Sequence, residues 1–347
     1  MSRLMFSAQH LLPGRGGIAQ VGRLSVKALS DRISFALAVE DTKTHALAGV
    51  PVHGFSGSRL RFVVRNAFEQ LRSAHALYDY AGTGRANLGR SYALWVHGAE
   101  FWTSEQLRPD YRRVIQNADC LLTNSHFSAR AMERALGHMP QASVCWLGTE
   151  HDDPPLPQTT EDPPTLLFVG RSDEFFAKGQ DILIKVWPLV VSKVRDARLC
   201  FAGAGIRLPE LRALAAGSSA ASNIDVLGFQ SEQEIEKLWR RATAFALLGN
   251  LEGFGLVVVE AMRHGIPVLT SNNDATCEIN VDGVTGYNVD RADEAGIADR
   301  LIALLADRDH AQSLGMNGLG RWREHFSFSV FRARFRETID PWLGTLE

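Results

Sequence analysis

The sequence contains little cysteine, and its few cysteines form no pattern. There are four in 347 residues, and none is part of a C-x-x-C pair: Cys120, Cys145, Cys200 and Cys277. This scatter argues against a zinc site and against a disulfide framework. Free thiols of this kind are typical of proteins that stay in a reducing compartment.

Long apolar runs are also lacking. No stretch approaches the ~20 residues that a membrane-spanning helix needs. The first ten residues, MSRLMFSAQH, have no apolar core of the kind found in signal peptides. Together these absences predict a cytoplasmic protein.

No charge of one sign dominates the whole chain, because its net charge is only −2. The two halves nevertheless differ. Residues 1–150 contain 17 Lys and Arg against 11 Asp and Glu, a balance of +6, which leaves −8 for the rest. The basic first half is therefore expected to meet an anionic partner.

A proline-rich acidic segment, EHDDPPLPQTTEDPPT at residues 150–165, divides the chain near its midpoint. Its composition is typical of a stiff linker. We therefore predict a first domain at 1–150 and a second at 165–325. The remaining stretch, 326–347, has an apolar and basic helical pattern, and we expect it to cross back to the first domain.

On both sides of the linker, short apolar runs alternate with helical patterns, as in parallel βαβ units. Residues 181–194 and 231–241 are examples of the amphipathic helices. The predicted strands are residues 3–8, 33–39, 75–80, 92–97, 120–125, 142–147, 165–170, 198–203, 224–229, 243–249 and 266–271. This pattern predicts an α/β protein of two Rossmann-like, doubly wound domains. Ligands bind beyond the carboxyl ends of such strands, so we expect a cleft between the domains.

The most informative motif is EGFGLVVVE, from Glu252 to Glu260. A strand leads into a glycine turn that opens a helix. Glycines let backbone amides approach a ligand closely, and the unpaired amides and dipole of a helix N-terminus attract anions. A glutamate inside the helix, about two turns beyond Glu252, can accept hydrogen bonds from vicinal hydroxyls such as those of ribose. By itself, the spacing is also compatible with an ordinary surface helix.

Two cations precede this motif. Arg171 follows the first strand of the second domain, and Lys178 comes just before the next helix. Such a pair can neutralise a diphosphate, although each could equally be a solvated surface charge. Two further turns, at Gly203 and Phe229, follow strands where a base and a ribose could lie.

These motifs together, in the order FVGR…KG, FAGAG, LGF…EIEKLW and EGFGLVVVEAMRHGIPVLTS, resemble those of the retaining glycosyltransferases of family 4, which have the GT-B fold. The resemblance covers essentially the whole second domain. It implies that Arg171 and Lys178 bind the diphosphate of a nucleotide sugar. It further implies that Glu252 lies near the transferred sugar and that Glu260 binds ribose. The backbone amides that it places on sugar or phosphate are those of Gly253, Phe254, Gly255 and Leu256.

In the first domain, a glycine turn containing Gly16 and Gly17 follows the first strand and opens a helix. A dinucleotide fingerprint is a weaker alternative, because the third glycine and the downstream acid are missing. The resemblance implies that the amides of Gly16 and Gly17 face the donor diphosphate.

Several polar residues lie at the ends of other strands in this domain. His97 could be a packed or surface histidine, but the resemblance implies a place near the transferred sugar. Glu100, Asn124 and Ser125 are candidate acceptor-side groups. Asn124 and Ser125 could instead cap the following helix.

Residues 59–72 mix arginines with large apolar residues at helical spacing. Such a helix can lie on an anionic membrane surface, or it can be half-buried with its arginines solvated. The +6 balance of the domain favours the membrane, and hence peripheral contact with the inner face of the cell membrane.

We therefore predict a retaining hexosyltransferase that uses GDP-mannose or a UDP-hexose. The acceptor would be a glycan or lipid-linked hydroxyl in bacterial surface polysaccharide assembly. No D-x-D pattern is placed to bridge metal and phosphate, so we predict metal independence and no cofactor beyond the GDP or UDP donor substrate. No nucleic acid partner is expected. The alternatives are a nucleotide-sugar hydrolase or epimerase of the same fold and a non-catalytic nucleotide-sugar-binding partner.

Overall fold

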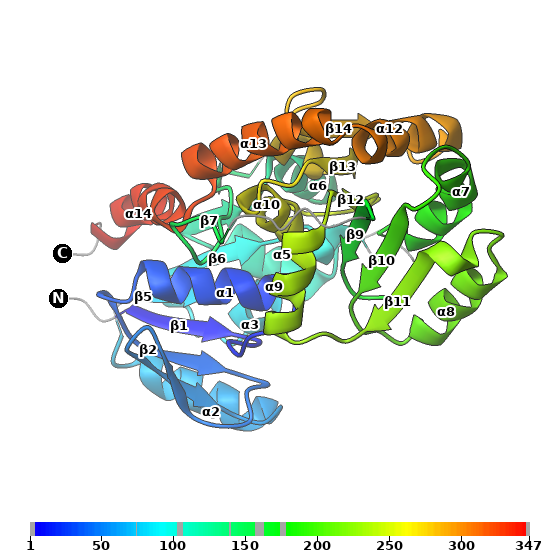
Figure 1. Ribbon diagram of the computed structural model, residues 1–347. Helices are drawn as coiled ribbons and strands as arrows, with labels where there is room; N and C mark the ends of the chain where they lie inside the picture. Colours follow the sequence, from blue (N-terminus) through cyan, green and yellow to red (C-terminus); the bar gives the residue numbers. More distant parts are fainter. Residues whose placement is uncertain are drawn as a thin grey trace. The chain divides into compact units, whose positions relative to one another are not determined.

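The computed structural model describes residues 4–73, 75–102, 107–138, 140–156, 163–173 and 178–344. The chain forms two compact units, Met1–Glu150 with Phe326–Glu347, and His151–His325. Each unit contains one sheet with helices packed on it (Figure 1). The predicted linker lies where the units meet in the sequence, and its residues 157–162 are outside the described residues.

The first unit contains an eight-stranded sheet within the described residues, ordered β3-β4-β2-β1-β5-β6-β7-β8. All its neighbouring strands run parallel except β3 and β4, which form an antiparallel hairpin. The order reverses between β1 and β5, and such a switch point is where doubly wound sheets bind ligands. The strands are β1 (Leu4–Ala8), β2 (Ile33–Ala38), β3 (His45–Leu47), β4 (Val50–Gly54), β5 (His75–Tyr78), β6 (Tyr92–Val96), β7 (Cys120–Thr123) and β8 (Ala142–Val144).

Strands β1, β5 and β6 are buried along their whole length, which explains their apolar sequences. The helices of this unit are α1 (Gly17–Ala28), α2 (Arg59–Gln70), α3 (Ala81–Gly84), α4 (Ala99–Trp102), α5 (Pro109–Gln116), α6 (His126–Leu136) and α14 (Phe328–Gly344). The last of these packs on α1 and places Phe335 against Trp95, with ring centroids 5.5 Å apart. The C-terminal segment thus belongs to the core of the first unit.

The second unit contains a six-stranded parallel sheet in the order β11-β10-β9-β12-β13-β14. Numbered within the unit, this is the 3-2-1-4-5-6 order of dinucleotide-binding sheets, with its switch point between β9 and β12. The strands are β9 (Thr165–Val169), β10 (Arg198–Ala202), β11 (Ile224–Gly228), β12 (Ala244–Leu247), β13 (Val268–Ser271) and β14 (Gly286–Val289). The helices are α7 (Gln180–Lys193), α8 (Leu208–Gly217), α9 (Glu232–Arg241), α10 (Leu256–Arg263), α11 (Thr276–Ile279), α12 (Glu294–Ala306) and α13 (Arg308–His325).

Every strand predicted from the sequence is present, and the predicted helices at 181–194 and 231–241 correspond to α7 and α9. The sequence analysis missed β3, β4 and β14. All three are short, and β3 and β4 join through the tight turn Ala48–Gly49, whose residues both have positive φ. No helix in the described part of the chain combines the length and the apolar character needed to cross a bilayer.

Candidate active site

Lys178 is held at the switch point of the second unit by backbone contacts. Its carbonyl oxygen accepts a hydrogen bond from the amide of Leu248 at 3.1 Å, just after β12. The next residue, Gly179, has a φ of 84°, and a Cβ there would lie 2.5 Å from the Cβ of Leu248. Only glycine allows this close approach. Lys178 and Gly179 are therefore docked against the end of β12.

The backbone of Glu252 is held by the loop after β13. Its amide donates to Oδ2 of Asp274 at 3.4 Å, and its carbonyl accepts from the amide of Ala275 at 3.2 Å. Its carboxylate oxygen Oε2 lies 3.0 Å from Nζ of Lys178. Both side chains are partly exposed. The fold thus brings two residues 74 positions apart into an ion pair beside the switch point.

Asp274 is a residue of this site that the sequence analysis did not select. It is buried, and its Oδ1 accepts hydrogen bonds from the amide and the hydroxyl of Thr276 at 3.0 and 2.5 Å. Burial raises the pKa of its carboxyl group, and the charge of Glu252 adds to this. The available signal was an acid shortly after a buried strand, which is common in ordinary turns.

The glycine turn after Glu252 opens α10 as predicted. Gly255 is the residue before the helix and has a φ of 94°, and a Cβ there would meet Cγ2 of Thr276 at 2.9 Å. Phe254 is only 3% exposed, so its ring is not available to a ligand. Leu256 and Glu260 on α10 are half-buried.

Arg171 is placed differently from Lys178. Its side chain is 64% exposed, and its Nε lies 2.9 Å from Oδ2 of Asp173. Its carbonyl accepts a hydrogen bond from Nε2 of Gln180 at 3.1 Å, which fixes the backbone but not the guanidinium. Within the described residues, the two predicted diphosphate cations therefore have separate carboxylate partners.

The turns after β10 and β11 pack on the turn after β9. Gly203 has a φ of 142°, and a Cβ there would lie 2.0 Å from the carbonyl oxygen of Gly170. The amide of Gly203 donates to the carbonyl of Gly228 at 2.8 Å. The next residue, Phe229, has 78% of its surface exposed. A large aromatic ring left in water at this edge is suited to stacking on a flat ligand.

In the first unit, the turn after β1 also ends at a helix N-terminus. Gly16 precedes α1 with a φ of 92°, and no side chain caps the helix. Gly16 and Gly17 are exposed, and a Cβ at either position would meet nothing within 4 Å. The open amide end of α1 is therefore a feature that can receive an anion.

His97 lies buried at the carboxyl end of β6. Its Nε2 is 2.6 Å from the carbonyl oxygen of Asp79, and since a carbonyl can only accept, Nε2 must carry the proton. Burial lowers the pKa of the imidazole. The amide of His97 donates to Oε2 of Glu100 at 3.1 Å. A neutral His97 can therefore only accept a hydrogen bond from a ligand, through Nδ1.

Asp79 at the end of β5 is the second residue that the sequence analysis missed. Its carboxylate is fully buried and accepts hydrogen bonds from the amide of Gln9 at 2.8 Å and the hydroxyl of Thr83 at 2.7 Å. Burial raises its pKa to about 7, with a further contribution from the charge of Glu100. Gln9 follows β1, so Asp79 joins the two loops at the switch point of this unit.

Asn124 and Ser125 differ in their hydrogen bonding. Ser125 is the N-cap of α6, because its side chain accepts from the amide of Ser128 at 3.0 Å. Asn124 is buried, and its Oδ1 has no hydrogen-bond partner within the described residues. The same holds for Oε1 of Glu100. Buried acceptors without partners are rare, and they are often completed by a ligand or a water molecule.

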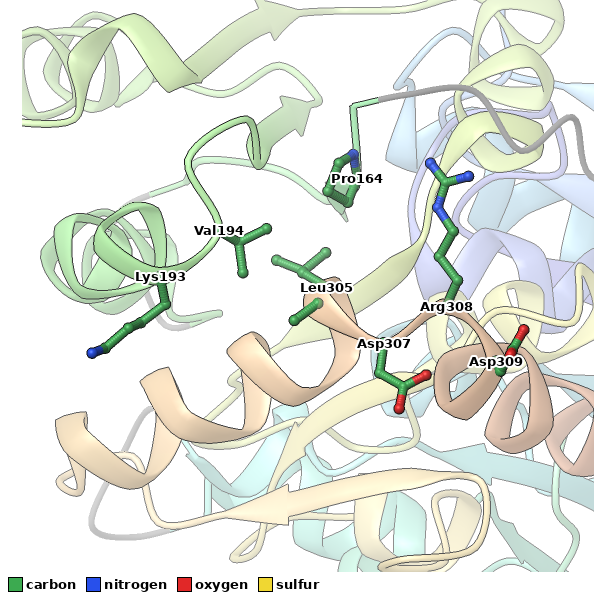
Figure 2. Close-up of a pocket in the computed structure, with 8 residues that line it drawn as sticks. Pro164, Lys193, Val194, Leu305, Asp307, Arg308 and Asp309 are labelled. Atoms are coloured by element: carbon green, nitrogen blue, oxygen red, sulfur yellow. The ribbon is translucent and has the colours of Figure 1, made fainter.

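The second unit also has a surface depression of about 680 Å³, which none of the candidate site residues lines (Figure 2). It is lined by Pro164, Val194, Leu305 and neighbouring charged residues. Pro164 directly precedes β9, so the depression is at the amino end of that strand, opposite the edge that carries Lys178. We therefore do not assign it to the candidate site. No group of three metal-ligating side chains occurs among the residues that the structure describes.

Comparison with known proteins identifies the family of the chain. The family model "Glycosyl transferases group 1" matches residues 152–321. A GDP-mannose-dependent monoacylated alpha-(1-6)-phosphatidylinositol monomannoside mannosyltransferase of Corynebacterium glutamicum is 30% identical over 280 residues, which are 75% of this chain and 72% of the relative. The chain belongs to the glycosyl transferases group 1 family.

A second relative, a GDP-mannose-dependent alpha-(1-6)-phosphatidylinositol monomannoside mannosyltransferase of Mycobacterium tuberculosis, is 32% identical over 157 residues. That match covers 42% of this chain and 41% of the relative. The chain thus matches about two-fifths of the length of several of its curated relatives.

Solved structures share the fold at lower identity. Anabaena HepE in complex with UDP-glucose has a TM-score of 0.82 at 18% identity, covering 98% of this chain and 100% of that one. Sucrose-phosphate synthase of Thermosynechococcus elongatus has a TM-score of 0.79 at 17% identity, covering 99% of both chains. The predicted fold class, two Rossmann-like α/β domains of the GT-B type, is confirmed. The predicted cleft stays a prediction.

Proposed function

We propose that this protein is a retaining hexosyltransferase that moves a hexose from a nucleoside diphosphate sugar to a hydroxyl group. The acceptor is a glycan or a lipid-linked saccharide of a bacterial surface polysaccharide. The protein acts in the cytoplasm, with peripheral contact at the inner face of the cell membrane. The observation that carries the proposal is the Lys178–Glu252 pair beside the N-terminus of α10, at the switch point of a family-matched sheet.

In this proposal the second unit binds the donor. Lys178 and Arg171 contact the diphosphate, and the amides of Gly253 to Leu256 contact the phosphate or the sugar. An ammonium group has three donors, so Lys178 can keep Glu252 as one partner and still donate to a phosphate oxygen. Glu252 then lies within reach of the hydroxyls of the sugar.

The base and ribose lie along the neighbouring turns. Phe229 is exposed beside Gly203 and Gly228, where a base can stack. Glu260, one helix turn inside α10, accepts hydrogen bonds from the ribose hydroxyls. GDP-mannose is the first donor to test, because the relatives from Corynebacterium and Mycobacterium are named as GDP-mannose-dependent enzymes.

The first unit supplies the acceptor side and part of the phosphate site. The amide end of α1 at Gly16 and Gly17 adds backbone donors for the diphosphate. His97 accepts a hydrogen bond from a hydroxyl of the transferred sugar through Nδ1. Asn124 and Glu100, which each hold a buried oxygen without a partner in the described residues, accept from the hydroxyls of the acceptor.

The main catalytic contribution in this proposal is electrostatic. When the bond between the anomeric carbon and the phosphate oxygen breaks, negative charge develops on the diphosphate. Lys178, Arg171 and the helix amides stabilise this charge and do so without a metal ion, in the way that preorganised donors stabilise an oxyanion. Retention follows if the acceptor attacks the same face of the sugar that the diphosphate leaves.

A ligand screen by thermal shift tests the donor assignment directly. GDP-, UDP- and ADP-sugars are compared, and a true donor at 100 times its dissociation constant should stabilise the protein by roughly 2.7 kcal/mol. Arg171→Ala and Glu260→Ala variants should lose most of this shift. If both variants bind the donor like the parent, the site assignment is wrong.

Product analysis separates transfer from its alternatives. A transferase forms a glycoside only when an acceptor is present, and proton NMR of the product reports the anomeric configuration. Rapid release of free sugar in water alone would favour a hydrolase, and conversion of the donor to another nucleotide sugar would favour an epimerase. Donor binding without any turnover across an acceptor panel would favour a binding protein. EDTA should leave the transfer rate unchanged.

A further inference from the structure

Two turns that follow neighbouring strands meet at the carboxyl edge of the second sheet. Strands β12 and β13 pair in parallel, so the chain leaves both of them at the same edge (Figure 1). The turn after β12, residues 248–255, contains Glu252 and leads into α10. The turn after β13, residues 272–275, contains Asp274 and leads into α11. We call residues 248–255 the Glu252 turn.

The carboxylate of Asp274 fills the inside of the Glu252 turn. Its Oδ2 accepts a hydrogen bond from the amide of Glu252 at 3.4 Å. A Cβ on Gly249 would lie only 2.6 Å from the same oxygen, so a side chain at that position would press on the carboxylate. The carbonyl of Glu252 in turn accepts from the amide of Ala275 at 3.2 Å. Both backbone groups of Glu252 are thus held by the turn after β13.

The other carboxylate oxygen of Asp274 is fixed by its own neighbourhood. Oδ1 accepts hydrogen bonds from the amide and the hydroxyl of Thr276 at 3.0 and 2.5 Å. Together with the amide of Glu252, three donors point at this one side chain. Only a side chain whose two oxygens both accept can satisfy them, because an asparagine would set its NH₂ group against one of the donors. These contacts therefore require a carboxylate and not an amide.

Stability alone does not explain an acid at this position. Asp274 is only 4% exposed. Burial raises the pKa of its carboxyl group, and the charge of Glu252 adds to this. A buried carboxylate beside a second carboxylate opposes folding unless its hydrogen bonds offset the cost. Acids that are kept under such conditions are frequent at functional sites.

The Glu252 turn carries contacts to both ends of the lysine that faces it. Leu248, the first residue of the turn, donates its amide to the carbonyl of Lys178 at 3.1 Å. At the other end, Nζ of Lys178 lies 3.0 Å from Oε2 of Glu252. The shape of the turn therefore sets where the ammonium group and the carboxylate meet. A change inside the turn is expected to move this ion pair.

We propose that Asp274 is a positioning residue for donor binding, because its carboxylate holds the Glu252 turn in the shape that joins Glu252 to Lys178. The inference rests on the proposed function, in which this ion pair contacts the diphosphate and the sugar of the donor. Asp274 is buried and acts on the donor through Glu252. Its removal should therefore have little effect on donor binding once the side chain of Glu252 is absent.

The first experiment is a double-mutant cycle on the whole protein, with calorimetric affinities for GDP-mannose and UDP-glucose as the measurement. Asp274→Asn should weaken binding of the donor about tenfold, the effect of one hydrogen bond to a charged group. In the Glu252→Ala background the same change should cost less than about twofold, because residues that act as one unit are not additive. Asp293→Asn is the matched control and should bind like the parent. Asp293 also accepts from a backbone amide, that of Gly296, but at the start of α12.

Gly249→Ala gives an independent test, because it presses on the carboxylate without removing it. Its Cβ would meet Oδ2 of Asp274, whereas a Cβ on Gly320 would meet nothing within 4 Å. Gly249→Ala should also weaken donor binding about tenfold, and Gly320→Ala should not change it. Thermal unfolding shows whether each variant is folded. If Asp274→Asn does not fold, Gly249→Ala in the parent and in the Glu252→Ala background decides the question.

Amide hydrogen exchange followed by NMR gives a readout that needs no ligand. If Asp274 holds the turn, the amide of Glu252 should exchange about tenfold faster in Asp274→Asn than in the parent. The amide of Gly296, which Asp293 caps, should exchange at the same rate in both proteins. Equal exchange of the Glu252 amide in the two proteins would overturn the proposed hold on the turn.

The possible outcomes separate this inference from the proposed function. Folded Asp274→Asn that binds the donor like the parent would overturn the role of Asp274 and leave the donor site in place. So would losses in the cycle that simply add, since Asp274 would then act independently of Glu252. A parent protein that binds neither nucleotide sugar would overturn the proposed function and the donor role of Asp274 with it. The exchange of the Glu252 amide would still show whether Asp274 holds the turn.

Discussion

The two sheets carry different chemistry at the ends of their strands. At the switch point of the second unit, Lys178 and Glu252 form an ion pair that is partly open to water. At the switch point of the first unit, Asp79 is fully buried in hydrogen bonds, and nearby His97 is buried and neutral. Both arrangements are built on loops after parallel strands, so the difference comes from the side chains and not from the topology.

This difference indicates which kind of ligand each sheet is suited to receive. An exposed ion pair is held weakly, because its charges keep part of their hydration. Its ammonium can therefore take a new anionic partner at little cost. A buried polar network is a costly place for a further charge, but it can accept hydroxyl groups. We therefore propose that the second unit, together with the amide end of α1, binds the anionic part of the substrate, and that the buried polar groups of the first unit contact uncharged sugar hydroxyls.

The sharpest way to break this comparison is to remove the ammonium at Lys178. Lys178→Met should lower kcat/KM for the donor about 10²- to 10³-fold, as for other groups that stabilise a developing charge. Lys185→Met is the matched control. Lys185 lies on the exposed side of α7 and also pairs with a glutamate, Glu294 of α12. Steady-state kinetics and donor affinity give the measurement. A similar loss in both variants would mean that the effect is not specific to the site.

A substitution at Gly203 tests the close backbone packing at the same edge of the sheet. Gly203→Ala would place a Cβ 2.0 Å from the carbonyl oxygen of Gly170, so it should lower the free energy of unfolding by roughly 3 kcal/mol. Gly217→Ala, where a Cβ meets nothing within 4 Å, should change it by less than about 0.5 kcal/mol. Urea unfolding measures the free energy of unfolding of both variants. Equal effects would show that the close contact between Gly203 and Gly170 does not require glycine.

Asp79 should make the first unit respond to pH. Its pKa is about 7 in the folded protein against 3.8 for the free side chain. The folded state therefore keeps a proton that the unfolded state releases, and stability falls as pH rises from about 4 to about 7. Asp79→Asn mimics the protonated form and should be more stable than the parent at pH 8 by up to about 4 kcal/mol, because a pKa difference of about 3 is worth about 1.4 kcal/mol per unit.

The difference between the two proteins isolates this carboxyl group, because all their other titrating groups are the same. Urea unfolding of both between pH 4 and pH 8 gives the comparison. The two stability curves should meet at the acidic end and separate toward the basic end. Curves that stay parallel over this range would show that Asp79 is ionised in the folded protein.

His97 should give the smallest of these effects. If His97 accepts one hydrogen bond from a sugar hydroxyl, His97→Ala should lower kcat about tenfold, the value of one buried hydrogen bond. Donor affinity should fall by no more than the same factor, in contrast to the larger loss for Lys178→Met. Ser128→Ala is the control, because the hydroxyl of Ser128 donates to the backbone carbonyl of His97 at 3.3 Å. A purely structural role for His97 would instead lower stability and leave kcat unchanged.

Much of the fold could be predicted because its signals are local. Buried parallel strands such as β6 and β9 are short apolar runs. Helix α9 is preceded by Ser231, whose side chain accepts a hydrogen bond from the amide of Glu234. The strands β3, β4 and β14 were missed because their sequences, HAL, VPVHG and GYNV, are interrupted by polar residues, glycine or proline. Asp79 and Asp274 were missed for another reason. An acid after a strand resembles any turn residue until its burial and its distant hydrogen-bond partners are known.

Helix α2 shows most clearly where local pattern is insufficient. Its sequence predicts an amphipathic helix, and the usual expectation is that the apolar side packs inward. The structure turns that side outward because Asn66 and Gln70 satisfy the carbonyl of Ala86 inside the unit. No spacing within residues 59–72 reveals this partner.

By itself, the sequence determined the alternation of strands and helices, the glycine turns before α1 and α10, and the family to which the chain is similar. These depend on neighbouring residues and on the conformations that glycine allows. Only the tertiary structure decided that Lys178 pairs with Glu252, that His97 must hold its proton on Nε2, and that Asp79 is buried. Each of these depends on groups far apart in the chain, which the packing of parallel strands brings to one edge of a sheet.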